Sequence, residues 1–465
     1  MANNTIHIKQ QTDTIVRRSS FRGLHLDDAK LTAHLSIKRL AFAPLLILPL
    51  RQHIGKPSIA VVKTDEEVSR GQLLARADGF LSTCLHAPVS GVVKKFDWVP
   101  SAAGMTPGMY LQATPGATQE VIPGTPCHLD TAGAEDIIQA IQNAGIVGLG
   151  GAAFPTHAKL KPPEGKVVDT LVVNGAECEP YLTTDHRVML EQTDDIVNGI
   201  LYCLKASGAR QAMIGIESNK TDAAKSLNQT LSRRNLHARI SVHLLPVKYP
   251  QGADKLLIHS LLQRTVPSGG HAYDIGAVTV NVATAAEIGH LLPLGQGIQE
   301  RVITVSGPAV LKPGNYRITI GTPLRFILET LGVKDSLSRV FLGGPMMGKA
   351  VAGLDIPITK GVSSVLAFDA EHVKDQRKVY PCIHCGHCVE VCPMGLNPSQ
   401  LGLQAKQQAY QDMAAYHLTD CFECGACAYV CPSHIPLTQY FRVAKAALTK
   451  LNRKAKPQTP ASGEL

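Results

Sequence analysis

Two short stretches near the C-terminal end of the chain carry four cysteines each at the same spacing. They read CIHCGHCVEVCP, residues 382–393, and CFECGACAYVCP, residues 421–432. Both follow the pattern C-x2-C-x2-C-x3-C-P, in which a tight loop presents three thiolates and a fourth comes just before a proline. Four thiolates at this spacing suit the corners of a [4Fe–4S] cluster, so the repeated run predicts two clusters.

One loop reaches only three corners of a cluster, so we expect the fourth ligand to come from the other run. A pair of tetrahedral zinc sites is the alternative, because His384 and His387 lie between cysteines of the first run. The doubled motif favours iron and sulfide over zinc. The expected ligands are Cys382, Cys385, Cys388 and Cys431 for the first cluster, and Cys421, Cys424, Cys427 and Cys392 for the second.

The composition is that of a soluble, folded protein. The chain has 465 residues, of which 45% are hydrophobic and 18% charged, and this length predicts about three domains. It has no run of about 18 apolar residues that could cross a membrane, and MANNTIHIKQ lacks the apolar segment of a secretory signal. The net charge of +9 is thinly spread, which gives nucleic-acid binding little support. We therefore expect a cytoplasmic protein whose other cysteines, Cys84, Cys127, Cys178 and Cys203, are mostly buried thiols.

The pattern of apolar residues changes along the chain. Short β-type runs between residues 35 and 100 predict a small β-sandwich, and the Pro- and Gly-rich segment 100–130 predicts a linker or surface loops. From residue 134, helical and strand-like runs alternate, with one long helix over 186–208, which predicts an α/β sheet with parallel crossovers. Residues 300–350 predict a β-rich module with one helix, and helical segments follow residue 376.

The fold class is therefore multi-domain α/β, with five regions. These are an N-terminal β-sandwich with a linker (1–130), an α/β domain (131–295), a β-rich module (296–370), a helical two-cluster domain (371–450) and a flexible tail (451–465).

A glycine-rich stretch is the candidate entry point for electrons, because two clusters alone only relay single electrons. It reads GIVGLGGAAFPTHAKL, residues 145–160. Backbone N–H groups of its glycines can approach a phosphate, and Lys159 adds a positive charge. GLGGAA matches the dinucleotide fingerprint, but a helix precedes it where a strand should, and Pro155 interrupts the next helix. Taken alone, the loop predicts a tight turn as readily as a ligand cradle.

A second candidate stretch, VVNGAECEPYLTTDHR at residues 172–187, lies at the carboxyl end of an apolar strand. Open α/β sheets bind their ligands at this edge. The amide of Asn174 can hydrogen-bond a flavin ring edge, and Glu177 or Glu179 can bind a ribose diol. A solvated loop is the alternative for the two acids.

Several ordered motifs resemble one known family. The glycine stretch followed by N-x-x-E-x-E-P is similar to the flavin- and NADH-binding subunit of respiratory complex I. With the doubled cysteine motif, the segments YPQGADKLLIHSLLQRTVPSGG, NVATAAEI and VSGPAVLKPGNYRITIGTPL resemble the RnfC (RsxC) family over residues 21–445. Members of this family are the C subunits of Rnf ion-translocating electron transport complexes. The A subunit of a sodium-pumping NADH:quinone reductase shares the earlier regions but lacks the cysteine runs.

The resemblance implies FMN and NADH sites in the α/β domain. Phe154 and Glu179 match positions that line the nicotinamide nucleotide site. Where the related protein has an acidic pair, this chain has Ala253 and Asp254, and an aromatic residue is missing near Pro162. The residues implied for FMN are Gly148, Gly150, Gly151 and Lys159, with Asn174, Glu177, Asn281 and Thr284 closing the pocket.

The resemblance also covers the flanking modules. HAPVSGVV, residues 86–93, resembles a lipoyl- or biotinyl-type β-sandwich. The expected hairpin tip, ADGFLST, has no lysine, which implies a scaffold without a swinging cofactor. RITIGTPLRFIL, residues 317–328, resembles the β-grasp module called SLBB.

The implied function is electron transfer between NAD(H) and two [4Fe–4S] clusters. A nicotinamide exchanges hydride and a cluster accepts one electron, so a flavin must stand between them. The resemblance implies a peripheral protein on the cytoplasmic face of the inner membrane, within an ion-translocating oxidoreductase. Its expected partners are the other Rnf subunits, especially the ferredoxin-like B subunit and the membrane subunits. The alternatives are a soluble NADH diaphorase component of a hydrogenase or dehydrogenase, and an electron wire without enzymatic activity.

Overall fold

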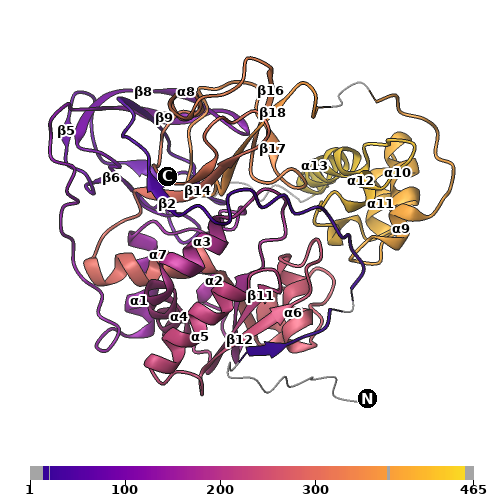
Figure 1. Cartoon of the computed structure of the whole chain (residues 1–465), viewed down its shortest axis with the longest axis horizontal. Coiled ribbons are helices and arrows are strands. Elements are labelled where there is room, and N and C mark those ends of the chain that lie inside the picture. The colour runs from indigo at the N-terminus through magenta and orange to yellow at the C-terminus, as the bar shows by residue number, and fades with distance from the viewer. Residues whose placement is uncertain (1–13, 20, 374–376, 456–465) are drawn as a thin grey trace, which may run out of the picture. The chain divides into compact units, whose positions relative to one another are not determined.

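The computed structural model describes residues 14–19, 21–373 and 377–455 (Figure 1). These residues form two compact units. The first unit consists of residues 14–19 and 26–373, and the second of residues 21–25 and 377–455. Within the described ranges, no helix has both the length and the apolar character needed to cross a membrane.

The N-terminal part of the first unit is the expected β-sandwich. Its four-stranded sheet has the order β3 (Leu45–Pro49), β9 (Gly104–Ala113), β8 (Gly91–Ser101) and β5 (Glu67–Val68). A three-stranded sheet contains β4 (Ile59–Ala60), β6 (Leu73–Arg76) and β7 (Leu85–His86). Leu46, Ile47 and Leu48 of β3 are all buried, so both faces of this strand are covered.

The prediction of loops over residues 100–130 was wrong for its first part. β8 extends to Ser101, and β9 lies between β3 and β8 in the middle of the sheet. Glycine, proline and threonine in GMTPGMYLQA suggested a loop, but Met109 and Leu111 are fully buried. Pairing with strands on both sides therefore outweighs the weak local β-propensity of this segment.

The α/β domain contains the predicted parallel sheet. Its order is β1 (Thr14–Val16), β12 (Ile240–Leu245), β11 (Gln211–Glu217), β10 (Thr170–Gly175) and β13 (Ala277–Asn281), and every pair is parallel. Alternate β10 residues face different layers, because Leu171 packs in the main core and Val172 packs with Leu257 of α6. The helices are α1 (Ala134–Asn143), α2 (Thr156–Leu160), α3 (Thr184–Glu191), α4 (Thr193–Ser207), α5 (Thr221–Arg233), α6 (Asp254–Leu262) and α7 (Val282–Leu291), with short 3-10 turns at Ala272–Ile275 and Leu292–Leu294.

The single helix predicted over residues 186–208 is two helices. The backbone leaves helical geometry at Gln192, which has φ −127° and ψ 35°. Asp194 and Asp195 then lie in the first turn of α4, where carboxylates favour a new helix start. The predicted end is confirmed, because Gly208 caps α4 in the left-handed conformation.

The β-rich module that follows is built on a six-stranded sheet with its own hydrophobic core. The order is β17 (Lys349–Ala350), β16 (Leu337–Leu342), β18 (Ser364–Asp369), β14 (Glu300–Ser306), β15 (Gly314–Thr319) and β2 (Ile37–Arg39). The predicted helix is α8 (Leu324–Leu331), whose buried face includes Leu324, Ile327 and Leu328. β2 is supplied by the N-terminal segment.

The second unit is helical, as expected, and its helices are drawn in orange to yellow in Figure 1. Its elements are α9 (His387–Glu390), α10 (Pro398–Lys406), α11 (Tyr410–Ala415), a 3-10 turn at Leu418–Asp420, α12 (Ala426–Tyr429) and α13 (Leu437–Ala455). Its small core includes Leu401, Met413 and Phe441. α13 reaches Ala455, and the rest of the predicted tail, residues 456–465, lies outside the described residues.

Candidate functional site

Each cysteine run folds into the same local structure. Gly386 and Gly425 precede the short helices α9 and α12 with φ angles of +83° and +82°, which glycine adopts without strain. His384 and Glu423, each one residue before the second cysteine of its run, are left-handed too, at φ +54° and +63°. Each run is therefore a tight loop, and the first three cysteines of a run lie around one cavity.

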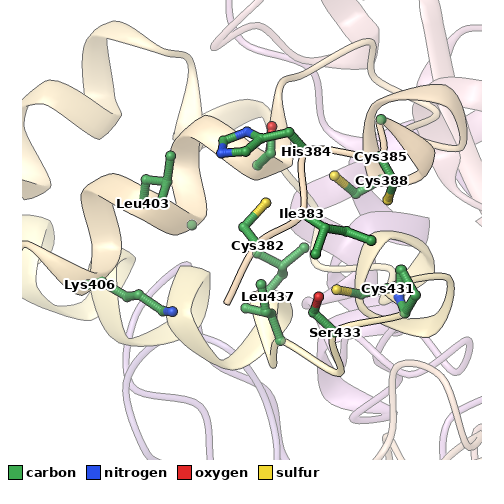
Figure 2. Close-up of a pocket in the computed structure, with 15 residues that line it drawn as sticks. Cys382, Ile383, His384, Cys385, Cys388, Leu403, Lys406, Cys431, Ser433 and Leu437 are labelled. Atoms are coloured by element: carbon green, nitrogen blue, oxygen red, sulfur yellow. The ribbon is translucent and has the colours of Figure 1, made fainter. Parts of the chain in front are cut away.

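The structure brings the two predicted sets of cysteines together, one set at each of two cavities. Figure 2 shows the first cavity, where three cysteines of the first run meet one cysteine of the second run. The lining cysteines are Cys382, Cys385, Cys388 and Cys431 at the first cavity, and Cys421, Cys424, Cys427 and Cys392 at the second. Four thiols around each cavity are the donor set of a [4Fe–4S] cluster, so these residues fit that group.

The cysteines at the second cavity are less exposed than those at the first. Cys392 and Cys424 are buried there, whereas Cys385 at the first cavity is exposed. Burial raises the pKa of the Cys424 thiol to about 12, and the neighbouring Cys421 and Cys392 act in the same direction. A bound iron ion would reverse this tendency, because a metal ion deprotonates a coordinating thiol.

The glycine stretch of the α/β domain forms a loop that is closed by backbone hydrogen bonds between its two ends. Gly148 N donates to the Phe154 carbonyl at 2.8 Å, and Ala153 N donates back to the Gly148 carbonyl at 3.2 Å. Leu149 N donates to Thr284 Oγ1 in the first turn of α7 at 2.9 Å. Phe154 and Thr284 therefore hold the shape of the loop.

The tip of this loop faces open space. Gly151 has φ +114°, and a Cβ atom built there would have no atom within 4 Å. The N–H groups of Gly150 and Gly151 donate no hydrogen bond within the described ranges of the chain. Unpaired N–H groups next to open space fit an anionic group such as a flavin phosphate.

Asn174 and Asn281 lie opposite each other at the carboxyl ends of β10 and β13. Asn174 Nδ2 donates to the Gly252 carbonyl at 2.8 Å. Asn281 caps α7 by accepting from Ala283 N at 2.9 Å, and its Nδ2 donates to Asp185 Oδ2 at 2.7 Å. Burial, reinforced by the nearby Glu177, raises the pKa of Asp185 to about 7. Both amides are thus held in place at the edge where the glycine loop lies, since Gly150 is next to Asn281.

Glu177 is buried and Glu179 is half-buried, and both accept hydrogen bonds from backbone N–H groups, so the solvated-loop alternative does not describe them. Glu177 accepts from Asp185 N at 2.9 Å and so caps the start of α3. Glu179 accepts from Met346 N at 3.0 Å and from Met347 N at 2.8 Å. Burial raises the pKa of Glu179, against the opposing effect of these two N–H groups. In this conformation Glu179 fastens the loop 344–348 to the α/β domain.

Lys159 forms an ion pair at the same edge of the sheet. Its Nζ lies 2.8 Å from Asp254 Oδ2, which also accepts from Thr279 Oγ1 at 2.7 Å. Both charged side chains are partly exposed. The pair can therefore exchange partners with a phosphate at modest cost.

Lys30 holds the backbone of the loop that contains Glu177 and Glu179, and no sequence pattern indicated this lysine. Lys30 Nζ donates to the carbonyl oxygens of Glu177, Glu179 and Leu182 at 2.8, 2.7 and 2.8 Å. Burial lowers the pKa of Lys30, while Glu177 acts in the opposite direction. Lys30 comes from an N-terminal segment with no periodic pattern, so only the folded chain reveals its role.

Two further buried basic side chains hold the glycine stretch, and both come from the β-rich module. Arg301 donates to the Leu149 carbonyl at 3.1 Å and also binds the Lys360 carbonyl. Lys360 Nζ donates to the carbonyls of Gly145 and Cys84 at 2.8 and 2.6 Å. Both side chains are 1% exposed. The only sequence signal was their charge within apolar surroundings.

The cysteines outside the runs are all free. Cys84 and Cys203 are buried as predicted, whereas Cys127 and Cys178 are half-buried.

Matches to protein-family models follow the order of these domains. The models are the RnfC barrel sandwich hybrid domain at residues 19–109, the Nuo51 FMN-binding domain at 141–290, the SLBB domain at 302–350 and the 4Fe-4S dicluster domain at 381–435. The chain thus combines an FMN-binding domain with a domain for two [4Fe–4S] clusters, and it has the cofactor set of a flavin- and iron–sulfur-dependent electron carrier.

Three similar curated proteins, from three organisms, are C subunits of ion-translocating oxidoreductase complexes. The chain is 41% identical to the C subunit of the proton-translocating ferredoxin:NAD(+) oxidoreductase complex of Clostridium ljungdahlii, over 92% of this chain and 93% of that protein. It is 38% identical to the C subunit of the ion-translocating oxidoreductase complex of Rhodobacter capsulatus, over 92% of this chain and 83% of that protein. It is 39% identical to the Na(+)-translocating counterpart of Acetobacterium woodii, over 88% and 92%. The chain belongs to the RnfC family.

A crystal structure of an NAD+-reducing [NiFe]-hydrogenase matches 73% of this chain and 74% of that chain at 19% identity with a TM-score of 0.49. This likeness is too weak to bear on function.

Proposed function

We propose that this protein is the component of an Rnf-type complex that exchanges electrons between NAD(H) and the iron–sulfur and membrane subunits. The observation that carries the proposal is the presence, in one chain, of a glycine loop with unpaired N–H groups and two cavities that are each lined by four thiols. FMN, when bound, accepts a hydride and releases electrons one at a time, which links nicotinamide and cluster chemistry.

Crossed ligation of the clusters is part of the proposal. Cys431 completes the first site and Cys392 the second, because each lines the cavity formed by the other run. Each cysteine run then contributes ligands to both clusters. We therefore expect electrons to pass from one cluster to the other within the second unit.

In the α/β domain, we assign phosphate binding to the N–H groups of Gly150 and Gly151, with Lys159 as the nearby cation. Gly148 and Thr284 fix the loop, and Asn174 and Asn281 border the flavin at the strand ends. Glu177 holds the start of α3 behind them. Phe154 and Glu179 are the residues proposed for NADH, and Glu179 must leave Met346 and Met347 before it can bind a ribose.

The partners in this proposal are the other Rnf subunits, especially the ferredoxin-like B subunit and the membrane subunits. The protein would lie at the cytoplasmic face of the inner membrane as the NADH-linked part of an ion translocase. The proposed domain limits are 1–130, 131–295, 296–370 and 371–450, except that β1 joins the sheet of the second domain, β2 joins the sheet of the third, and α13 runs on to Ala455. These assignments rest on the family membership and the domain order.

Two observations favour a second candidate, an electron wire without NADH oxidation. The carboxylate proposed for NADH is occupied by backbone donors, and Ala253 and Asp254 stand where the related complex I protein has two acids. FMN-loaded protein that fails to reduce ferricyanide with NADH would support this candidate.

The test is anaerobic reconstitution of the full chain, with iron, acid-labile sulfide and FMN measured per chain. EPR spectra are then recorded after NADH and after dithionite. We expect two interacting [4Fe–4S] signals, and partial reduction by NADH. Cys392→Ser should perturb the second cluster, and Cys431→Ser the first. Zinc in place of iron would overturn the proposal, and perturbation of the first cluster by Cys392→Ser would overturn the crossed ligation.

A further inference from the structure

Matching helices follow the two cysteine runs, so the two cavities can be compared position by position. α10 begins at Pro398, and α13 begins at its counterpart Leu437. The second residue of each helix carries a hydroxyl group and lines a cavity: Ser399 the first, Thr438 the second. Any difference between these two hydroxyl groups is therefore a difference between the two cluster sites.

The hydroxyl group at the first site is already engaged. Ser399 Oγ donates to Asn397 Oδ1 at 2.7 Å. Asn397 Oδ1 also caps α10, because it accepts from Gln400 N at 3.1 Å. The counterpart of Asn397 in the second repeat is Pro436, which has no side-chain acceptor. The local partner of Ser399 is thus missing for Thr438.

Thr438 is 6% exposed, and its Oγ1 has no hydrogen-bond partner among the residues that the structure describes. A buried hydroxyl left unpaired is unfavourable, because it has lost its hydrogen bonds to water. The cavity that Thr438 lines is also lined by Cys392, Cys421 and Cys424. A cluster held there would bring sulfur acceptors next to this hydroxyl group.

We propose that Thr438 Oγ1 donates a hydrogen bond to a sulfur of the second cluster or of one of its cysteine ligands. This inference rests on the proposed function, because it requires the cluster. The bond stabilises the reduced state, which carries one more negative charge, and so raises the reduction potential of the second cluster. The first cluster lacks the equivalent bond, since Asn397 holds the hydroxyl group of Ser399.

The test compares Thr438→Val, which removes the hydroxyl group at nearly constant shape, with Thr438→Ser, which keeps it. Potentiometric titrations followed by EPR use the full, anaerobically reconstituted chain. Thr438→Val should lower the reduction equilibrium constant of the second cluster roughly three- to tenfold, where tenfold is about 59 mV for one electron. The first cluster should not shift. Thr438→Ser should restore the wild-type value, and Ser399→Ala should change neither cluster.

Iron and sulfide contents are measured before each titration, so that a missing cluster is distinguished from an unchanged potential. If both clusters are present and Thr438→Val leaves both potentials unchanged, the hydrogen bond is absent and the inference is wrong, while the proposed function stands. If the wild-type protein forms no clusters, the inference about Thr438 and the proposed function are both wrong. Should Thr438→Val fail to hold the second cluster, Thr438→Ala supplies the same comparison without the branched side chain.

Discussion

Lys30 Nζ lies 2.7 Å from the carbonyl oxygen of Glu179, and so joins the N-terminal segment to the loop that follows β10. The same ammonium group binds two more carbonyls of this loop, those of Glu177 and Leu182. One side chain thus satisfies three backbone acceptors, and all three lose this donor if the lysine is removed.

Lys30→Met should therefore destabilise the first unit and weaken the flavin site. We expect the free energy of unfolding to fall by about 1–3 kcal/mol, the cost of leaving buried acceptors unpaired, and the dissociation constant of FMN to rise. Thermal unfolding and fluorescence titration with FMN measure the two effects. Lys349→Met, at an exposed position of β17, is the matched control. Equal stability and FMN affinity in Lys30→Met and the control would contradict the positioning role.

Lys360 gives the stability of the protein a specific pH dependence. Burial lowers the pKa of Lys360 from 10.5 to about 7 in the folded protein. Between these values the unfolded chain binds a proton that the folded chain does not, so this lysine makes stability rise as pH increases from 7 toward 10.5. We expect Lys360→Met to lose this contribution.

Melting temperatures of wild type and Lys360→Met between about pH 7 and pH 9 test this directly. The difference between wild type and the variant should shift in favour of wild type as pH rises. Lys349→Met should follow the wild-type profile throughout. A constant difference between wild type and Lys360→Met would show that Lys360 keeps its proton over this range.

The architecture was predictable because each module has a strong local pattern. Alternating helices and apolar strands identified the parallel sheet, and the doubled cysteine spacing identified the two-cluster unit. Errors occurred where long-range pairing overrides local preference, as at β9, or where the helical pattern hides a break, as at Gln192. The structure places the glycine loop and the two strand-end asparagines at one edge, as the sequence suggested.

The supporting residues of the site were not predictable. Lys30, Arg301 and Lys360 lie far from the flavin-domain motifs in sequence, and their hydrogen bonds to this region go to backbone carbonyls. A carbonyl acceptor leaves no signature in the chain, because every residue has one. The hydrogen bonds of Glu179 could not be predicted from the sequence for the same reason, because their donors are the backbone N–H groups of residues 346 and 347.

Glu179 provides a test that separates a latch from a nucleotide ligand. Glu179→Ala removes both acceptors of the loop 344–348, so we expect faster proteolytic cleavage in this loop without any ligand. If Glu179 also binds NADH, the variant should show a raised KM for NADH with a smaller change in kcat. Glu329→Ala, at an exposed position of α8, serves as the control. Faster cleavage with unchanged KM would assign Glu179 to the latch alone.

Removal of iron should unfold the second unit and spare the first. Among the described residues of the second unit, the hydrophobic core has eight buried members, and most of the cysteines of the two runs pack against it. So small a core seldom stabilises a domain alone, and metal binding then supplies much of the folding free energy. After oxidative loss of the clusters and chelation, we expect limited proteolysis to digest residues 377–455 while residues 26–373 stay resistant. Reconstitution with iron and sulfide should restore resistance, and an apo protein whose C-terminal segment resists as well as the loaded form would show that the helices fold without the clusters.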